Sequence, residues 1–293
     1  MLEFRDIKAE DKLIFDRYRQ PGSIASEAVF ATMFIWNDYY NLKVAEDSEF
    51  FYFQFNVKNR IPSYYFPIGS GDCNAALDVL KEYTRANGHV MAFRLVTEEQ
   101  LEKLRAYSGA EFLANEERDC EDYIYPSAQL ISLAGKKLHA KRNHINYFLE
   151  NYEYTYETVT PEVAKNECAP LMYELIEHKD HNVNSFELPA MKRFFDNYEI
   201  LGERGAVIRV GGEIVAMSFG EPLSDQAALI QLEVAREEYR GAYQMINKLF
   251  CENEWRDYPF INREEDMGIE GLRRAKESYH PIFLVKKYTV IEI

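Results

Sequence analysis

The order of the expected secondary-structure elements repeats after about half of the 293 residues, and this repetition restricts the possible folds more than any single motif does. Over residues 1–125, hydrophobic periodicity predicts a strand, a helix, a hairpin, a strand, a helix, a strand, a helix and closing strands. Residues 151–293 predict the same order from different side chains. A mixed order that occurs twice indicates two tandem α/β domains with mixed sheets, joined by a connector at residues 126–150.

Residues that favour caps and turns support several of these boundaries. In "GSGDCN", Asp72 is placed to cap the following helix, so this loop is interpreted as a capped turn rather than a dinucleotide-binding loop. Thr97 predicts a helix start and Gly88 a helix end. The pair Gly211 and Gly212 predicts a two-residue hairpin turn.

The composition is that of a globular chain in a reducing compartment. Hydrophobic residues make up 47% and charged residues 28%, and no run approaches the roughly 18 apolar residues that a membrane span needs. The charged N-terminal residues do not resemble a signal peptide. The cysteines form no CxxC pair, which favours free thiols over disulfides. We therefore expect a soluble, cytoplasmic protein without a transmembrane segment.

Several well-known catalytic motifs are missing from the sequence. There is no Walker A, HExxH or GxSxG motif, which argues against the corresponding NTPases, zinc proteases and serine hydrolases. His178 and His181 are three residues apart with acidic residues nearby, but no third metal ligand stands at a recognised spacing. We interpret this stretch as a solvated helix end and predict no metal site.

The segment "GKKLHAKRNHINYF" concentrates positive charge in a chain whose formal net charge is −15. No carboxylate occurs between Tyr123 and Leu149. On a helical wheel Arg142 shares a face with apolar residues. The neighbouring cationic face carries Lys137, Lys141 and His144. Two interpretations stay open: a solvated linker helix whose lysines offset nearby carboxylates, and an anion-binding site at the junction of the two halves.

A second candidate anion site follows the strand "ALIQLEVA", where "REEYRGAYQMINKLF" predicts a loop that opens a helix. The first turn of a helix presents unpaired N–H groups that can hold a phosphate. The element order, "EYRG" in this loop and the later "AKESYHP" resemble the GNAT N-acyltransferase fold, in which such a loop wraps the pyrophosphate of coenzyme A. The resemblance implies a donor site at Arg240, Gly241 and Tyr243. However, Tyr243 and Met245 replace two glycines of the family motif and would crowd a phosphate.

Acyl transfer to an amine requires a base for the proton and groups that stabilise the oxyanion. Candidate bases are Glu233, on the strand before the donor loop, and the acidic run Glu264, Glu265 and Asp266. Crowded carboxylates raise one another's pKa, which suits a base near neutral pH. The alternative interpretation is that these acids cap the next helix or pair with nearby arginines.

Two residues of the last predicted helix complete the candidate site. Arg273 is a possible partner of the acidic run, and we count it among the donor-binding cations. By the GNAT resemblance, Tyr279 stands where those enzymes often place a tyrosine acid. In a chain with 21 tyrosines, packing is the alternative role for Tyr279.

The motifs "GKKLHAKRNHINYF" and "NREEDMGIEGLRRAKESYHP" together resemble the family of the C-terminal domain of bacterial phosphatidylglycerol lysyltransferases. That family includes stand-alone proteins, is built from two GNAT-like halves, and is similar in plan to the Fem-type peptidoglycan aminoacyltransferases. The resemblance covers nearly the whole chain. It implies an aminoacyl-tRNA donor and transfer of the aminoacyl group to a lipid hydroxyl or a peptide amine.

The leading hypothesis is a transferase that passes an aminoacyl or acyl group from an anionic donor, aminoacyl-tRNA or acyl-coenzyme A, to an amine or a hydroxyl. One alternative is an N-acetyltransferase that uses acetyl-coenzyme A. Another is a non-catalytic tandem module that binds an anion or RNA. The sequence leaves the acceptor and the oligomeric state open.

Overall fold

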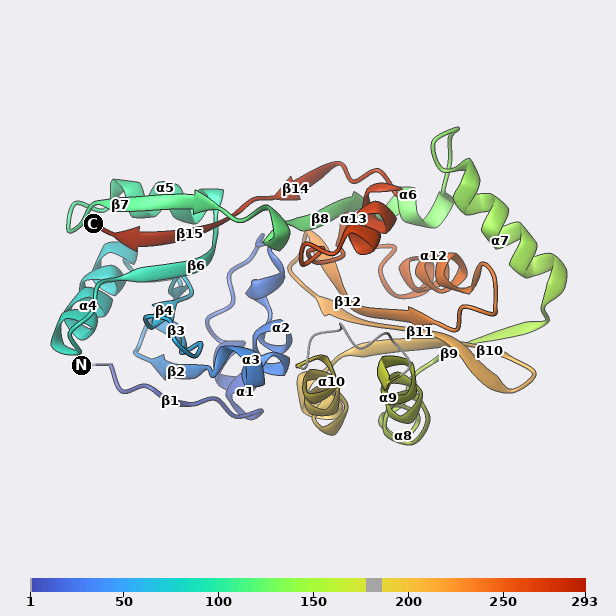
Figure 1. Cartoon of the computed structure of the whole chain (residues 1–293), viewed down its shortest axis with the longest axis horizontal. Coiled ribbons are helices and arrows are strands. Elements are labelled where there is room, and N and C mark those ends of the chain that lie inside the picture. Colours follow the sequence, from blue (N-terminus) through green and yellow to red (C-terminus); the bar gives the residue numbers. More distant parts are fainter. Residues whose placement is uncertain (1, 178–185) are drawn as a thin grey trace.

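The computed structural model describes residues 2–177 and 186–293. Within these residues, two mixed β-sheets of eight and seven strands form two lobes that lie end to end (Figure 1). The mixed α/β class expected from the sequence is therefore confirmed. Both chain termini lie in the same lobe, at the left of Figure 1.

The first sheet has the order β1-β2-β3-β4-β6-β15-β7, with β5 also paired to β3. Its strands are β1 (Arg5–Asp6), β2 (Lys43–Glu46), β3 (Phe50–Phe55), β4 (Ser63–Tyr64), β5 (Ile68–Gly69), β6 (Ala92–Thr97), β7 (Phe112–Glu116) and β15 (Lys287–Glu292). The helices of this lobe are α1 (Asp11–Phe15), α2 (Phe30–Ile35), α3 (Asn37–Tyr40), α4 (Cys73–Ala86) and α5 (Glu98–Ala106). All six residues of β3 are buried, as its aromatic sequence predicts for a central strand.

The second sheet has the order β14-β8-β13-β12-β11-β10-β9. Its strands are β8 (Asp122–Pro126), β9 (Tyr154–Thr158), β10 (Arg204–Val210), β11 (Glu213–Pro222), β12 (Ala227–Ala235), β13 (Phe260–Asn262) and β14 (Phe283–Val285). Its helices are α6 (Ser127–Ser132), α7 (His139–Asn151), α8 (Pro161–Val163), α9 (Ala169–Glu177), α10 (Glu187–Asp196), α11 (Tyr198–Leu201), α12 (Ala242–Glu254) and α13 (Glu270–Glu277). A π-helical turn, Ala164–Cys168, joins α8 to α9.

The expected caps and turns occur in the structure. The Asp72 side chain accepts from the Asn74 N–H at 2.9 Å, which caps α4. Thr97 and Gln100 form a capping box at the start of α5. Gly211 and Gly212 have φ of 60° and 89° and connect β10 to β11, as a primed hairpin turn requires.

The two lobes exchange one strand each, so the sheets follow the expected ranges 1–125 and 151–293 only in part. β8 starts before the expected boundary and pairs with β13 and β14 of the second sheet. The last strand, β15, returns to the first sheet and lies between β6 and β7. Figure 1 shows the two chain segments crossing between the lobes side by side. The expected connector corresponds to α6 and α7 with the loop between them.

The two faces of the second sheet have different neighbours. α6, α7 and α12 pack on one face, where Ala216, Ile230 and Phe250 belong to one core. On the other face, Phe219 shares a core with residues of the first lobe, including Phe51. The rings of Phe194 and Phe195 of α10 and of Tyr198 of α11 pack against Phe219. α10 in turn contacts α2 of the first lobe, so the core on the side opposite to α12 continues from the second sheet through α10 into the first lobe. None of the helices in the described residues is long and apolar enough to cross a membrane.

Candidate functional site

The candidate site lies where β12 and β13 diverge. These neighbouring strands are parallel and pair only between residues 227–229 and 260–262. β12 then continues to Ala235, paired with β11 on its other side. The carboxyl ends of diverging parallel strands are the usual place for ligands in α/β sheets, because backbone groups and side chains converge there without a neighbouring strand.

Glu233 is the acidic residue that β12 presents at this point. One of its carboxylate oxygens accepts from the Arg263 guanidinium at 2.8 Å, and the other accepts from the Asn247 amide of α12 at 2.9 Å. The Glu233 side chain is 10% exposed and that of Arg263 13%. Two directed hydrogen bonds hold the carboxylate in one orientation, facing α12.

Arg263 follows β13 and is enclosed by aromatic rings as well as by Glu233. Its guanidinium carbon lies 4.9 Å from the ring centre of Tyr279 and 5.8 Å from that of Tyr125. Burial acts to lower the pKa of Arg263, but the Glu233 carboxylate outweighs this effect and keeps the pKa above its ordinary value. The site therefore holds a permanent positive charge.

Lys141 of α7 brings a second cation to the same place. Its Nζ lies 4.1 Å from the centre of the Tyr279 ring, a favourable cation–π distance. Burial, together with the nearby positive charge of Arg263, lowers the pKa of Lys141 to about 8. Lys141 is thus charged at neutral pH but loses its charge under mildly alkaline conditions.

Three buried polar atoms around Glu233 lack a hydrogen-bond partner among the described residues. They are Oγ of Ser218, Oδ1 of Asn247 and Nη1 of Arg263. Ser218 is the cross-strand partner of Glu233, so the two side chains share a face of the sheet. A buried polar atom left unpaired costs about 1–3 kcal/mol. Three of them in one place indicate a ligand site, which we call the reaction centre: Lys141, Ser218, Glu233, Asn247, Arg263 and Tyr279.

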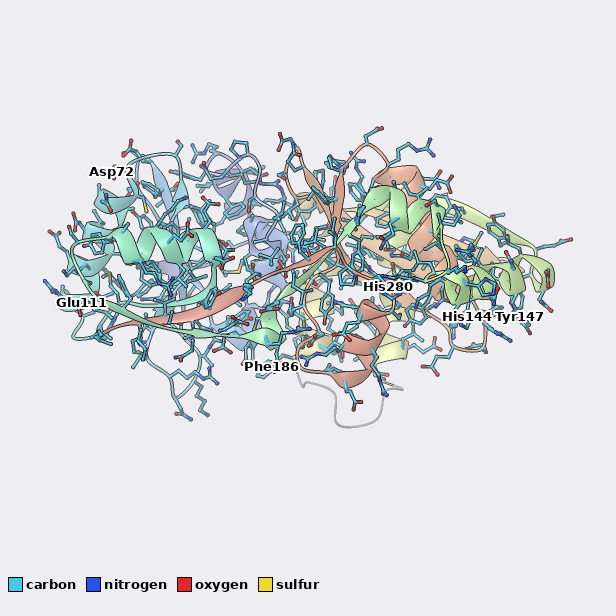
Figure 2. All side chains as sticks on the ribbon, turned by 90° about the horizontal axis from the view of Figure 1, so that it is seen from above. Asp72, Glu111, His144, Tyr147, Phe186 and His280 are labelled. Atoms are coloured by element: carbon cyan, nitrogen blue, oxygen red, sulfur yellow. The ribbon has the colours of Figure 1, made fainter. Side chains whose placement is uncertain are left out.

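Helix α7 also contacts the loop that precedes α12. The Arg240 guanidinium carbon lies 4.4 Å from the ring centre of Tyr147, and burial with the charges of Arg240 and Lys141 lowers the pKa of His144. Gly241 has φ of 95°, and a Cβ at this position would lie 2.2 Å from the carbonyl oxygen of His144. Figure 2 shows His144 and Tyr147 together on α7. The basic connector and the candidate donor loop are therefore adjacent.

Other expected donor-binding residues have different surroundings. Arg142 donates to the carbonyl oxygens of Leu133 and Gly135, the latter at 2.7 Å, at the end of α6. The two carbonyl oxygens are therefore the hydrogen-bond partners that Arg142 needs on the apolar face of α7. Lys137 is exposed in the loop before α7, and Tyr243 is 41% exposed on the first turn of α12.

Asp266 and Arg273 lie together in a separate ion-pair network. The fully buried Asp266 accepts from Arg273 at 2.8 Å and from the Tyr123 hydroxyl at 2.6 Å, and Arg273 also binds Asp119 at 2.7 Å. Burial acts to raise the pKa of Asp266, but these hydrogen bonds hold it well below its usual range. Asp266 is therefore a poor base near neutral pH. Arg273 links α13 to Asp266 and Asp119.

Glu265 and Tyr279 differ in their relation to the reaction centre. Burial and the neighbouring Asp122 raise the pKa of Glu265, whose other charged neighbours are Lys276 of α13 and Lys287 of β15. Glu265 is therefore not part of the reaction centre. Tyr279 belongs to the reaction centre, where burial raises its pKa above the ordinary value. Its hydroxyl thus stays protonated at neutral pH and is suited to donate a hydrogen bond.

Sequence reasoning missed Ser218, Asn247 and Arg263. Arg263 stands in the "NREED" motif, where a lone arginine beside three acids at a strand end was the available signal. Asn247 and Ser218 occupy ordinary core-facing positions of a helix and a strand. Local pattern gives no sign that they meet at Glu233, because that contact depends on tertiary packing.

The described residues hold no candidate metal site, and a surface pocket lies away from the reaction centre. His178 and His181 lie outside the described residues, and residues 2–177 with 186–293 contain no group of three or more His, Cys, Asp and Glu that could hold a metal ion. A pocket of about 420 Å³ lies beside α9 and the β10–β11 turn. Its arginines, Arg209 and Arg236, are bound by Glu167 at 2.7 Å and Glu174 at 3.1 Å. This pocket includes no residue of the reaction centre.

A family profile and solved structures match this chain over nearly its whole length. A family profile described as phosphatidylglycerol lysyltransferase, C-terminal, matches residues 19–291. A crystal structure of a conserved protein of unknown function from Bacteroides thetaiotaomicron is 32% identical, with a TM-score of 0.92 and 100% of both chains covered. An uncharacterized protein of Mycoplasmoides gallisepticum is 24% identical over 171 residues, which span 58% of this chain and 55% of that protein.

More distant structures share the fold at low identity. L-PGS from Bacillus licheniformis is 16% identical, with a TM-score of 0.70 and coverage of 98% of this chain and 92% of that chain. FemX is 11% identical, with a TM-score of 0.63 and coverage of 98% and 96%. The expected architecture of two GNAT-like lobes is confirmed.

Proposed function

The chain belongs to the family of phosphatidylglycerol lysyltransferase C-terminal domains, and from this membership and the geometry of the reaction centre we propose that it transfers an aminoacyl group from an ester donor, such as aminoacyl-tRNA, to an amine or hydroxyl acceptor. The observation that supports the proposal is that hydrogen-bond donors and acceptors without a partner lie together around Glu233. An aminoacyl ester carries an ammonium group next to its carbonyl. Both groups have complementary partners in this centre.

The unpaired atoms match the two ends of an aminoacyl group. Oδ1 of Asn247 and the Glu233 carboxylate accept hydrogen bonds, as an ammonium group requires. Nη1 of Arg263 and the Ser218 hydroxyl can donate to a carbonyl oxygen. A simple acetyl group would leave the Asn247 oxygen unpaired. This difference favours an aminoacyl over an acetyl donor.

The proposed roles follow the movement of charge during transfer. The acceptor atom forms a bond to the donor carbonyl carbon, and the carbonyl oxygen becomes an oxyanion beside Arg263 and Ser218. The acceptor atom gives up a proton in this step, which balances the proton that the ribose oxygen gains. The carbon–oxygen bond to the donor ribose then breaks, and the ribose oxygen takes a proton. Lys141 on α7 and Arg240, which lies against Tyr147 of the same helix, would bind the donor phosphates. Glu233 holds the donor ammonium rather than serving as the base, because Arg263 and Asn247 occupy its oxygens.

Acetyl-coenzyme A is a second candidate donor, because α12 begins directly after the diverging end of β12, as in GNAT enzymes. Two observations weigh against it. Gly241 faces the His144 carbonyl rather than open space, and Tyr243 and Met245 occupy the glycine positions of the pyrophosphate loop. Coenzyme A therefore stays the alternative donor.

Calorimetry with three ligands tests the proposal. We expect a non-hydrolysable alanyl-adenosine amide to bind, its des-amino analogue, propionyl-adenosine amide, to bind at least 10-fold more weakly, and coenzyme A to bind more weakly still. The variant Asn247→Leu should lose the preference for the amino analogue, since it removes the unpaired acceptor. Equal affinity of the two adenosine amides for the unmodified protein would contradict an aminoacyl donor.

A further inference from the structure

The first lobe repeats the strand arrangement of the reaction centre. β4 and β6 are neighbouring parallel strands that pair only at Tyr64 and Phe93, after which β6 continues to Thr97. Arg94 directly follows the residue of β6 that pairs with β4, as Arg263 directly follows the last residue of β13 that pairs with β12. Ligands of α/β sheets commonly bind where such strands diverge. Arg94 therefore occupies the position in the first lobe that Arg263 occupies in the second.

A β-bulge sets the direction of the Arg94 side chain. Arg94 and Leu95 of β6 together stand opposite one residue of β15, Thr289, and the register of the two strands shifts there. Leu95 has φ of 58°, a left-handed conformation that is costly for a leucine inside a strand. Bulges re-aim side chains and are frequent beside active sites. The bulge thus gives Arg94 an orientation that a regular strand would not provide.

The Arg94 guanidinium has no hydrogen-bond or ion-pair partner in residues 2–177 and 186–293. Its Nε is buried, whereas the side chain as a whole is only half-buried, so the Nη groups stay open to solvent. Other half-buried arginines, such as Arg118 and Arg236, bond carboxylates. A guanidinium partly withdrawn from water without a partner is unfavourable, and a bound anion would supply the missing acceptor.

Tyr40 of α3 provides a second donor beside Arg94. The Tyr40 hydroxyl has no hydrogen-bond partner among the described residues, and its ring packs edge-on against Tyr39 at 4.9 Å and Phe55 at 5.1 Å between ring centres. Burial and the charge of Glu265 raise the pKa of Tyr40, whereas the nearby Arg94 acts to lower it. The hydroxyl therefore stays protonated at neutral pH and is able to donate a hydrogen bond.

The acidic residues of this region do not take the place of a ligand. Glu27 and Glu265 both lie near Tyr40, but neither forms an ion pair with Arg94. Glu27 is bonded to Lys287, and the positive charge beside Glu265 comes from Lys276 and Lys287. The positive charge of Arg94 is therefore left without a counter-ion in direct contact.

We propose that Arg94 binds an oxyanion, the carboxylate or phosphate group of a small ligand, at the opening between β4 and β6, with the Tyr40 hydroxyl as a second donor. The planar guanidinium presents N–H groups that match two oxygens of either group. Arg94 and Tyr40 do not belong to the reaction centre, so this site does not depend on the proposed aminoacyl transfer.

Nuclear magnetic resonance of the full chain, isotope-labelled at arginine nitrogen, follows the site directly. The buried Nε–H of Arg94 exchanges slowly with water, and its signal is identified by its absence in Arg94→Lys. At constant ionic strength we expect inorganic phosphate or acetate to shift this signal saturably, and the anion with the higher affinity identifies the ligand as a phosphate or a carboxylate. Tyr40→Phe should weaken the binding about 3-fold or more. A signal that neither anion shifts saturably overturns the proposal.

Thermal unfolding separates ligand binding from a structural role. Because the guanidinium has no partner, Arg94→Leu should keep the melting temperature measured in chloride but lose most of the additional stabilisation by the bound anion. Arg105→Leu is the matched control, since it removes the same charge from an exposed position of the same lobe and should keep that stabilisation. Equal stabilisation of the two variants by the anion contradicts the site. A clear fall in the melting temperature of Arg94→Leu in chloride would show a structural role and would also count against it.

Discussion

Two arginines that the sequence assigns to anion binding have different surroundings in the structure. Arg142 and Arg240 stand in two candidate anion sites of the sequence, but the first bonds backbone carbonyls and the second lies on an aromatic ring beside the donor loop. The sequence could predict that positive charge gathers near the junction. It could not separate these roles, because the partner of each guanidinium is set by folding.

Arg142→Ala should therefore change the stability of the protein, and Arg240→Ala its affinity for the donor. Loss of the Arg142 hydrogen bonds should lower the free energy of unfolding by about 1–2 kcal/mol without changing donor affinity. Arg240→Ala should leave stability nearly unchanged and weaken binding of the trinucleotide CCA about 10-fold. Urea denaturation and calorimetry measure the two effects. A loss of CCA affinity in Arg142→Ala alone would reverse the assignment.

Gly241 is required by both its backbone conformation and its surroundings. At φ of 95°, with a Cβ placed 2.2 Å from the His144 carbonyl oxygen, Gly241→Ala should destabilise by at least about 1–3 kcal/mol. Gly271→Ala is the control, because nothing lies within 4 Å of a Cβ there and α13 accepts alanine. Thermal unfolding of both variants distinguishes them. Equal melting temperatures would show that α7 does not pack on the donor loop in this way.

Among the elements, α7 brings Lys141 to Tyr279 and covers the loop before α12. Its amphipathic pattern and basic face were readable in the sequence. The exchange of β8 and β15 was not, because strand partners far apart in the chain leave no local pattern. The same holds for Asn247 on α12, whose meeting with Glu233 depends on the packing of that helix on the sheet.

The charge on α7 should make donor binding pH-dependent. The pKa of Lys141 is about 8, so its positive charge is present below pH 8 and is lost as the pH rises through that value. The affinity for CCA, whose phosphates do not titrate there, should therefore fall between pH 7 and 9. Lys141→Arg should keep its affinity over this range, because arginine stays charged. Parallel pH profiles for the two proteins in calorimetric titrations would exclude Lys141 from phosphate binding.

Across the whole molecule, the exchanged strands and the shared core couple the lobes. Lys287 of β15 is fully buried and forms ion pairs with Glu27 and, at 3.2 Å, with Asp122 of β8. This contact joins the two strands that cross between the sheets.

Lys287→Met should lower the free energy of unfolding by about 3–5 kcal/mol, because it leaves buried carboxylates without their cation. Lys286→Met, at a 47% exposed neighbour, should change it by less than about 1 kcal/mol. Denaturation with guanidinium chloride provides the comparison. Similar losses in both variants would contradict the buried pairing.

Unfolding of the two lobes should also coincide. The chain has two tryptophans, Trp36 packed against the core that includes the first lobe and Trp255 buried in the second. The fluorescence of Trp36→Phe comes from Trp255 in the second lobe, and that of Trp255→Phe comes from Trp36 in the first lobe. We expect each variant to show a single unfolding transition, at the same denaturant concentration once the stability change of each variant is corrected for. Two separated transitions in the unmodified protein would show that the lobes fold independently.

A crystal structure with alanyl-adenosine amide would place the donor directly. The account predicts the ligand ammonium within hydrogen-bond distance of Asn247 Oδ1 and Glu233, its carbonyl oxygen against Arg263 Nη1, and its adenosine toward Lys141 and Arg240. Binding of the ligand in the surface pocket between Arg209 and Arg236, with the atoms around Glu233 untouched, would contradict it.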